Sequence, residues 1–104
     1  MVRERRKEMK VMEHNPLLSF EDGLEITYSD LKCREDGKDY ITIYFERPNA
    51  EGFFDSAQLD FPGSDFEKIK GFSNEDLEGF RFYVERSGKT ALQFSREEAN
   101  AKLS

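Results

Sequence analysis

Apolar and polar side chains alternate in five stretches of the chain, the pattern that half-buried β-strands produce. The clearest stretch covers residues 39–47, with Ile41 and Phe45 on the same face. A strand over residues 24–34 precedes it, and its apolar residues change phase near Ser29, as they would across a β-bulge. The other three strands are expected at residues 57–61, 80–84 and 91–94.

Turn residues and helix caps separate these strands. Residues 35–38 contain the Asp-Gly pair that suits a type I′ hairpin turn, and residues 86–89 predict a second hairpin. Three segments fit a capping box, in which a serine and an acidic residue three positions later cap the first turn of a helix. Short helices are therefore expected after Ser64, Ser73 and Ser95, the last over residues 96–103.

The order of these elements predicts the fold class. No long crossover separates the strands, which favours an antiparallel sheet over a parallel one. We expect an α+β protein, an antiparallel sheet of about five strands with short helices on one face. The 104 residues fit one domain, and 10 Phe with 4 Tyr supply a core that disordered chains lack.

The charge is distributed unevenly. Residues 1–14 carry five basic and three acidic side chains, whereas the other 90 residues carry 11 basic and 19 acidic ones, a net charge of −8. We expect residues 1–15 to form a basic, mobile arm and residues 16–104 to form the single α+β domain. An acidic body argues against a nucleic-acid partner, because phosphate binding needs clustered Lys and Arg.

The sequence also bears on the compartment. No apolar run approaches the roughly 18–20 residues that span a bilayer, and the charged N-terminal residues lack the apolar core of a signal peptide. Cys33 is the single cysteine, so an intramolecular disulfide is excluded. We therefore expect a cytoplasmic protein that does not bind membranes.

Candidate catalytic and metal chemistry is sparse. His14 and Cys33 are the only soft metal ligands, too few for a zinc site, and Cys33 is expected to be a small buried hydrophobe. Residues 74–85 partly match a calcium loop, but Arg81 stands where the pattern has an apolar residue. No catalytic residue, cofactor or metal site is predicted.

Three tyrosines suggest a contact surface. Tyr40, Tyr44 and Tyr83 are expected opposite the aliphatic side of their strands, and Arg81 shares that side with Tyr83. Tyrosine and arginine are enriched where proteins bind one another. The sequence therefore predicts a small non-enzymatic domain that binds another protein or itself through these four residues.

Two alternative functions are also considered. One is a small ligand-binding protein or enzyme with a carboxylate-lined pocket near residues 49–54, closed by Phe53 and Phe54. The other is an acidic inhibitor or immunity-type protein that neutralises a basic target, because residues 51–67 hold five carboxylates and no basic residue.

Overall fold

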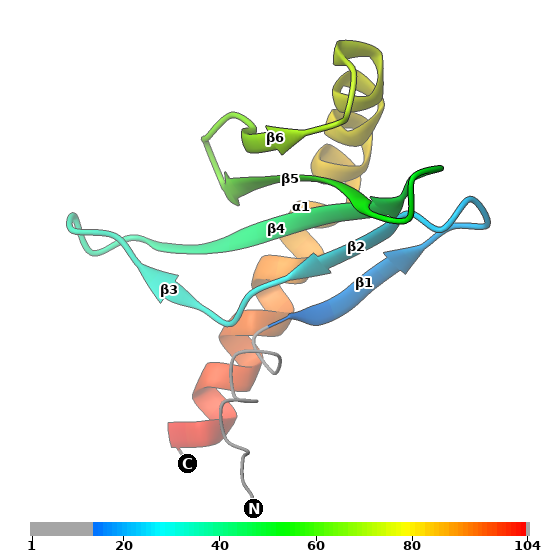
Figure 1. Cartoon of the computed structure of the whole chain (residues 1–104). Coiled ribbons are helices and arrows are strands. Elements are labelled where there is room, and N and C mark those ends of the chain that lie inside the picture. Colours follow the sequence, from blue (N-terminus) through cyan, green and yellow to red (C-terminus); the bar gives the residue numbers. More distant parts are fainter. Residues whose placement is uncertain (1–13, 104) are drawn as a thin grey trace, which may run out of the picture.

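The computed structural model describes residues 14–103, in which one antiparallel sheet lies against one long helix (Figure 1). The elements are β1 (Asn15–Ser19), β2 (Glu25–Tyr28), β3 (Lys32–Cys33), β4 (Asp39–Pro48), β5 (Phe54–Phe61), β6 (Glu67–Lys70) and α1 (Asn74–Leu103). The strand order is β1-β2-β4-β5-β6, and β3 pairs with β4. The predicted α+β class with an antiparallel sheet is thus confirmed. Because α1 crosses one face of the sheet, we call the opposite side the outer face.

β4 is central to the sheet, and its alternation sets the buried face. Ile41, Ile43 and Phe45 point toward α1 and are fully buried. The ring of Phe45 stacks on that of Phe80 in α1, with centroids 4.9 Å apart, and Phe72 meets Phe80 edge-on at 4.8 Å. Each fully buried side chain of this kind contributes about 1.5–3 kcal/mol, so this layer holds the helix on the sheet.

The predicted strand over residues 24–34 is interrupted where its pattern changes phase. β2 ends at Tyr28, and Ser29 then bonds to β4 through both its backbone and its side chain. The chain pairs with β4 again in β3, and the predicted hairpin turn follows. There Gly37 has a φ of 89°, and its N–H bonds to the carbonyl of Arg34. The hairpin is therefore confirmed, although only Gly37 of the Asp-Gly pair has the positive φ that a type I′ turn needs at both positions. The predicted bulge within one strand is instead a break between two strands.

The strands predicted at residues 80–84 and 91–94, and the turn between them, are wrong. All of these residues belong to α1, whose buried side chains recur every three or four positions, as an amphipathic helix requires. The alternation was misleading because Phe82 and Phe94 lie on the exposed side of the helix. Gly88 marks close packing instead of a turn, since a Cβ there would lie 2.7 Å from the ring of Phe61.

The short helices were also misplaced. Residues 64–67 do not form a helix, because only a single turn could fit before Gly71 and β6 instead pairs with β5. Residues 96–103 are the last turns of α1. The cap at Ser73 is confirmed: its hydroxyl accepts the Asp76 N–H at 3.1 Å, and Asp76 accepts the Ser73 N–H at 3.1 Å.

Residues 1–13 of the predicted basic arm lie outside the described residues, and Asn15 already belongs to β1. α1 is 30 residues long, but within the described chain no helix is apolar enough to cross a membrane.

Candidate functional site

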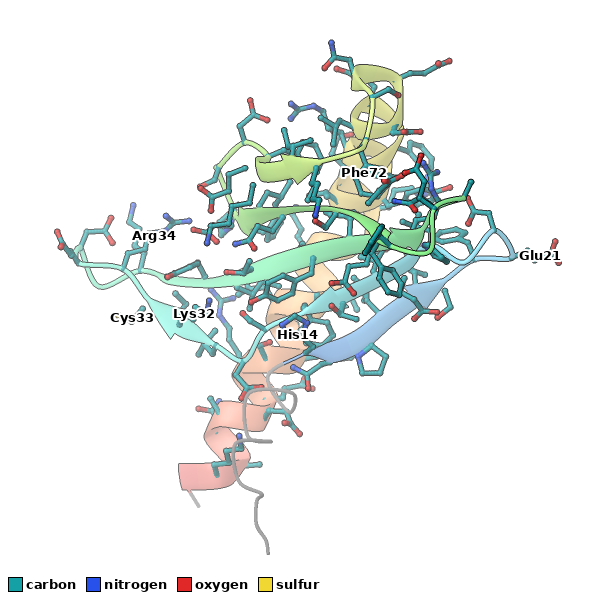
Figure 2. The ribbon with its side chains drawn as sticks, viewed as in Figure 1. His14, Glu21, Lys32, Cys33, Arg34 and Phe72 are labelled. Atoms are coloured by element: carbon teal, nitrogen blue, oxygen red, sulfur yellow. The ribbon has the colours of Figure 1, made fainter. Side chains whose placement is uncertain are left out.

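The four residues predicted to bind a partner lie in two different layers. Tyr40 and Tyr44 are on the outer face of β4, where Tyr44 stacks on His14 with ring centroids 3.9 Å apart. The Arg34 guanidinium carbon lies 4.6 Å from the centre of the Tyr40 ring, and Lys32 Nζ lies 5.9 Å from it. Figure 2 shows Lys32 at β3 and Arg34 farther along the hairpin, toward its turn.

The other two predicted residues lie on α1. Arg81 forms an ion pair with Asp65 at 2.6 Å, and this hydrogen bond, together with the Phe66 N–H, lowers the pKa of the Asp65 carboxyl. Tyr83 packs against Phe20, with ring centroids 5.0 Å apart. The structure does not bring the four residues onto one sheet face, because residues 80–84 are helical. Their role in binding stays a prediction.

The residues considered for metal or nucleophile chemistry are also dispersed. His14 lies over the outer face, whereas Cys33 is exposed in β3, contrary to the expectation that it is buried. The reason is that the β3–β4 hairpin extends beyond α1 (Figure 1). Residues 74–85 are continuous helix, so they form no calcium loop. Across residues 14–103, no group of three or more His, Cys, Asp or Glu side chains is placed to hold a metal ion.

The turn between β4 and β5 presents two adjacent aromatic side chains to water. Phe53 is 67% exposed and Phe54 is 56% exposed. The side chain of Asn49 braces this turn by accepting the N–H groups of Glu51 and Phe53, at 3.0 and 3.1 Å. It also donates to Asp55 Oδ1 at 3.1 Å. We call Phe53 and Phe54 the aromatic tip.

Arg47 connects the aromatic tip to two other segments. Its guanidinium lies 3.3 Å from an oxygen of Asp76, 3.7 Å from Asp22 and 3.8 Å from Asp55. It also lies over the ring of Phe72, with its Cζ 5.0 Å from the centroid. One partly buried cation thus holds together the β1–β2 turn, the start of β5 and the first turn of α1.

A hollow of about 500 Å³ lies beside this ion cluster. Its floor is apolar and mostly aromatic, and its rim is acidic; the lining residues are Phe20, Leu24, Phe80, Tyr83, Gly79, Glu21, Asp22, Glu75, Asp76 and Arg47. Figure 2 shows Glu21 at the end of the β1–β2 turn, pointing away from the sheet. The backbone N–H of Ser73 is the main cause that lowers the pKa of Asp76, with help from the Ser73 hydroxyl and Arg47.

The three segments around the aromatic tip concentrate negative charge. We call the group of six carboxylates and one guanidinium the acidic end: Glu21, Asp22, Glu51, Asp55, Glu75, Asp76 and Arg47. Its net charge of −5 is most of the −8 carried by residues 15–104. Sequence reasoning identified the carboxylates of residues 51–67 but missed the other acidic residues, because they come from segments far apart in the chain.

Comparison of the chain with protein-family models, with curated proteins and with solved structures gave no match.

Proposed function

We propose that this chain is a small, non-enzymatic protein-interaction domain that contacts its partner through the aromatic tip. The observation that carries this proposal is the exposure of Phe53 and Phe54, which are adjacent and more than half exposed. Contiguous exposed apolar surface marks interaction sites, and aromatic residues are enriched in protein interfaces. A cytoplasmic location belongs to the same proposal.

The construction of the turn favours binding. Three side-chain hydrogen bonds of Asn49 fix the turn before any partner arrives. Ordering a loop on binding costs affinity, so a turn that is already ordered retains more of the energy of its contacts. The aromatic tip is therefore preorganised for binding.

The alternative surfaces have partners within the chain. Tyr40 is contacted by Lys32 and Arg34, Tyr44 by His14, and Tyr83 by Phe20. Phe82 lies under the guanidinium of Arg86, whose Cζ is 5.0 Å from its ring centre. Tyr40 and Tyr44 remain the predicted second surface, on the outer face.

Quantitative affinity capture from the source cells tests the proposal. Three baits are compared: the wild-type chain, the double variant Phe53→Ala/Phe54→Ala, and the control Phe82→Ala/Phe94→Ala. The control removes two other exposed aromatic rings, 52% and 45% exposed, from α1. We expect a protein that wild type and control retain and that the tip variant loses. Equal retention by all three baits would refute a role for the tip.

A second candidate function rests on the hollow. An aromatic floor beneath an acidic rim suits a small organic cation, which could bind the rings and the carboxylates together. This hollow is a different site from the predicted pocket near residues 49–54, because none of those residues line it. Calorimetric titration with agmatine and spermidine tests it: heat that is lost in Glu21→Gln/Glu75→Gln supports the site, and absence of heat rejects it.

A further inference from the structure

We infer that the partner presents a basic surface, and that its lysine or arginine side chains bind the acidic end while an apolar site receives Phe53 and Phe54. This inference rests on the proposed function, since it assumes that the aromatic tip is a contact surface. It adds the chemical class of the partner.

The acidic end keeps an excess of negative charge, even though Lys70 in β6 pairs with Ser56, next to Asp55. Arg47 is shared among three carboxylates, so that cluster keeps an excess of two negative charges. Glu21 and Glu75 on the rim of the hollow, and Glu51 in the turn, form no ion pair with any residue between 14 and 103. Three carboxylates of the acidic end, those of Glu21, Glu51 and Glu75, are therefore available to a cation of a partner.

The hollow has the shape and chemistry that a long cationic side chain needs. Lysine and arginine place their methylene stems along apolar surface and keep the charged group at a polar edge. Phe20 and Tyr83 provide the apolar floor, and Glu21 and Glu75 stand at the rim. A volume of about 500 Å³ is ample for one such side chain. The aromatic tip thus provides an apolar contact, and the hollow provides a binding site for one cationic side chain of the partner.

The same charge disfavours two other occupants. A second copy of this chain that docked end to end would bring two acidic ends of net charge −5 together, and like charges across an interface oppose association. A membrane surface rich in anionic lipid would be repelled in the same way. A basic protein surface is attracted instead, which both strengthens and accelerates binding.

Selection of peptides on the intact chain tests the inference. A library of random peptides on phage is panned on the immobilised full-length protein, and Phe53→Ala/Phe54→Ala serves as the counter-target. We expect the peptides that depend on the tip to combine an apolar residue with a net positive charge. A synthetic copy of such a peptide should bind the tip variant about 30-fold more weakly than the wild type, as loss of an interface hot spot does.

Matched charge variants test the acidic end directly. Glu21→Gln/Glu75→Gln should weaken the same peptide about three- to tenfold, because exposed ion pairs contribute modestly. The control Glu35→Gln/Glu85→Gln removes the same charge from exposed positions elsewhere and should change affinity less than twofold. Added salt should reduce the difference in peptide affinity between the wild type and Glu21→Gln/Glu75→Gln, since the Debye length falls from about 10 Å at 0.1 M to about 3 Å at 1 M.

The outcomes separate the inference from the proposed function. Tip-dependent peptides that are neutral or acidic, or equal effects of the two charge variants, would overturn the basic partner while leaving the tip as a contact surface. Tip-dependent binding to phosphatidylcholine vesicles with or without phosphatidylserine, or a tip-dependent dimer in sedimentation, would also overturn it. Loss of tip dependence in both panning and cell capture would reject the proposed function itself.

Discussion

The hydroxyl of Ser95, in the second half of α1, donates a 3.0 Å hydrogen bond to the backbone carbonyl of Ser29, at the break between β2 and β3. Both residues are buried. The Ser29 hydroxyl in turn accepts the backbone N–H of Thr42 at 2.9 Å and donates to the Asp30 carbonyl at 2.8 Å. This polar link fixes where the helix crosses the interrupted edge of the sheet.

Replacing Ser95 by alanine should destabilise the protein. The Ser29 carbonyl would lose its bond from the helix within the core, which costs about 1–3 kcal/mol of unfolding free energy. Urea denaturation of the variant measures this loss. Ser87→Ala on the same helix is the control, because the half-buried Ser87 side chain makes no hydrogen bond with another described residue, and a change within about 0.5 kcal/mol is expected there. Equal losses in the two variants would contradict the role of the Ser95–Ser29 bond.

The sheet was predictable from local patterns, whereas the helix was not. The Asp-Gly turn and the alternation of residues 39–47 are patterns of a few neighbouring residues, and the structure contains both the turn and the strand that they predict. Residues 80–84 fit a strand over five positions, but the buried side chains from Leu77 to Ser95 repeat with the period of a helix. A longer window would have favoured the helix. Ser95, which the sequence predicted to cap a helix, is instead a buried residue within α1.

The candidate site was predictable only in part. The exposed loop of residues 50–54 follows from its own composition, because proline and asparagine end β4 and two phenylalanines follow. The ion cluster does not follow from any local pattern. Arg47 meets Asp22 and Asp76, which lie more than 20 residues away on either side, and only the packing of the turn and α1 against β4 brings them together.

Two glycines of α1 should respond to alanine in opposite directions. At Gly88 a Cβ would lie 2.7 Å from the Phe61 ring, whereas at Gly79 it would meet nothing within 4 Å. Gly79→Ala should stabilise the protein by about 0.5–1 kcal/mol through helix propensity. Gly88→Ala should destabilise it by about 1–2 kcal/mol, because overpacking outweighs the same gain. Thermal unfolding measures both, and a stabilised Gly88→Ala would show that Phe61 moves aside.

Two of the three predicted tyrosines, Tyr83 on α1 and Tyr40 on the outer face of the sheet, should differ in their contribution to stability. Tyr83 is half-buried and packs against Phe20 and the core, so Tyr83→Ala should cost about 2 kcal/mol or more. Tyr40 lies on the outer face with two cations over its ring, and Tyr40→Ala should cost less than about 1 kcal/mol. Urea unfolding ranks the two variants. The reverse order would mean that the outer face contributes more to the fold than α1 packing does. Tyr40→Ala is accordingly the cleaner probe of binding by the outer face.

Acid should weaken the protein in part through Asp76. The Ser73 N–H, the Ser73 hydroxyl and Arg47 hold the pKa of Asp76 in the folded state below its ordinary value of 3.8. A carboxyl whose pKa is lowered on folding stabilises the native state above its unfolded pKa, and this contribution is lost as the pH falls through the folded pKa. Asp76→Asn removes the charge and keeps an oxygen that can cap the helix. We therefore expect wild type to exceed Asp76→Asn in unfolding free energy at pH values above about 5, with the difference shrinking below about pH 4.

Urea unfolding at a series of pH values measures this difference in unfolding free energy, with the exposed Glu85→Gln as the control for removing one charge. A difference between wild type and Asp76→Asn that does not change with pH would show that the cap and Arg47 do not favour the ionised carboxyl.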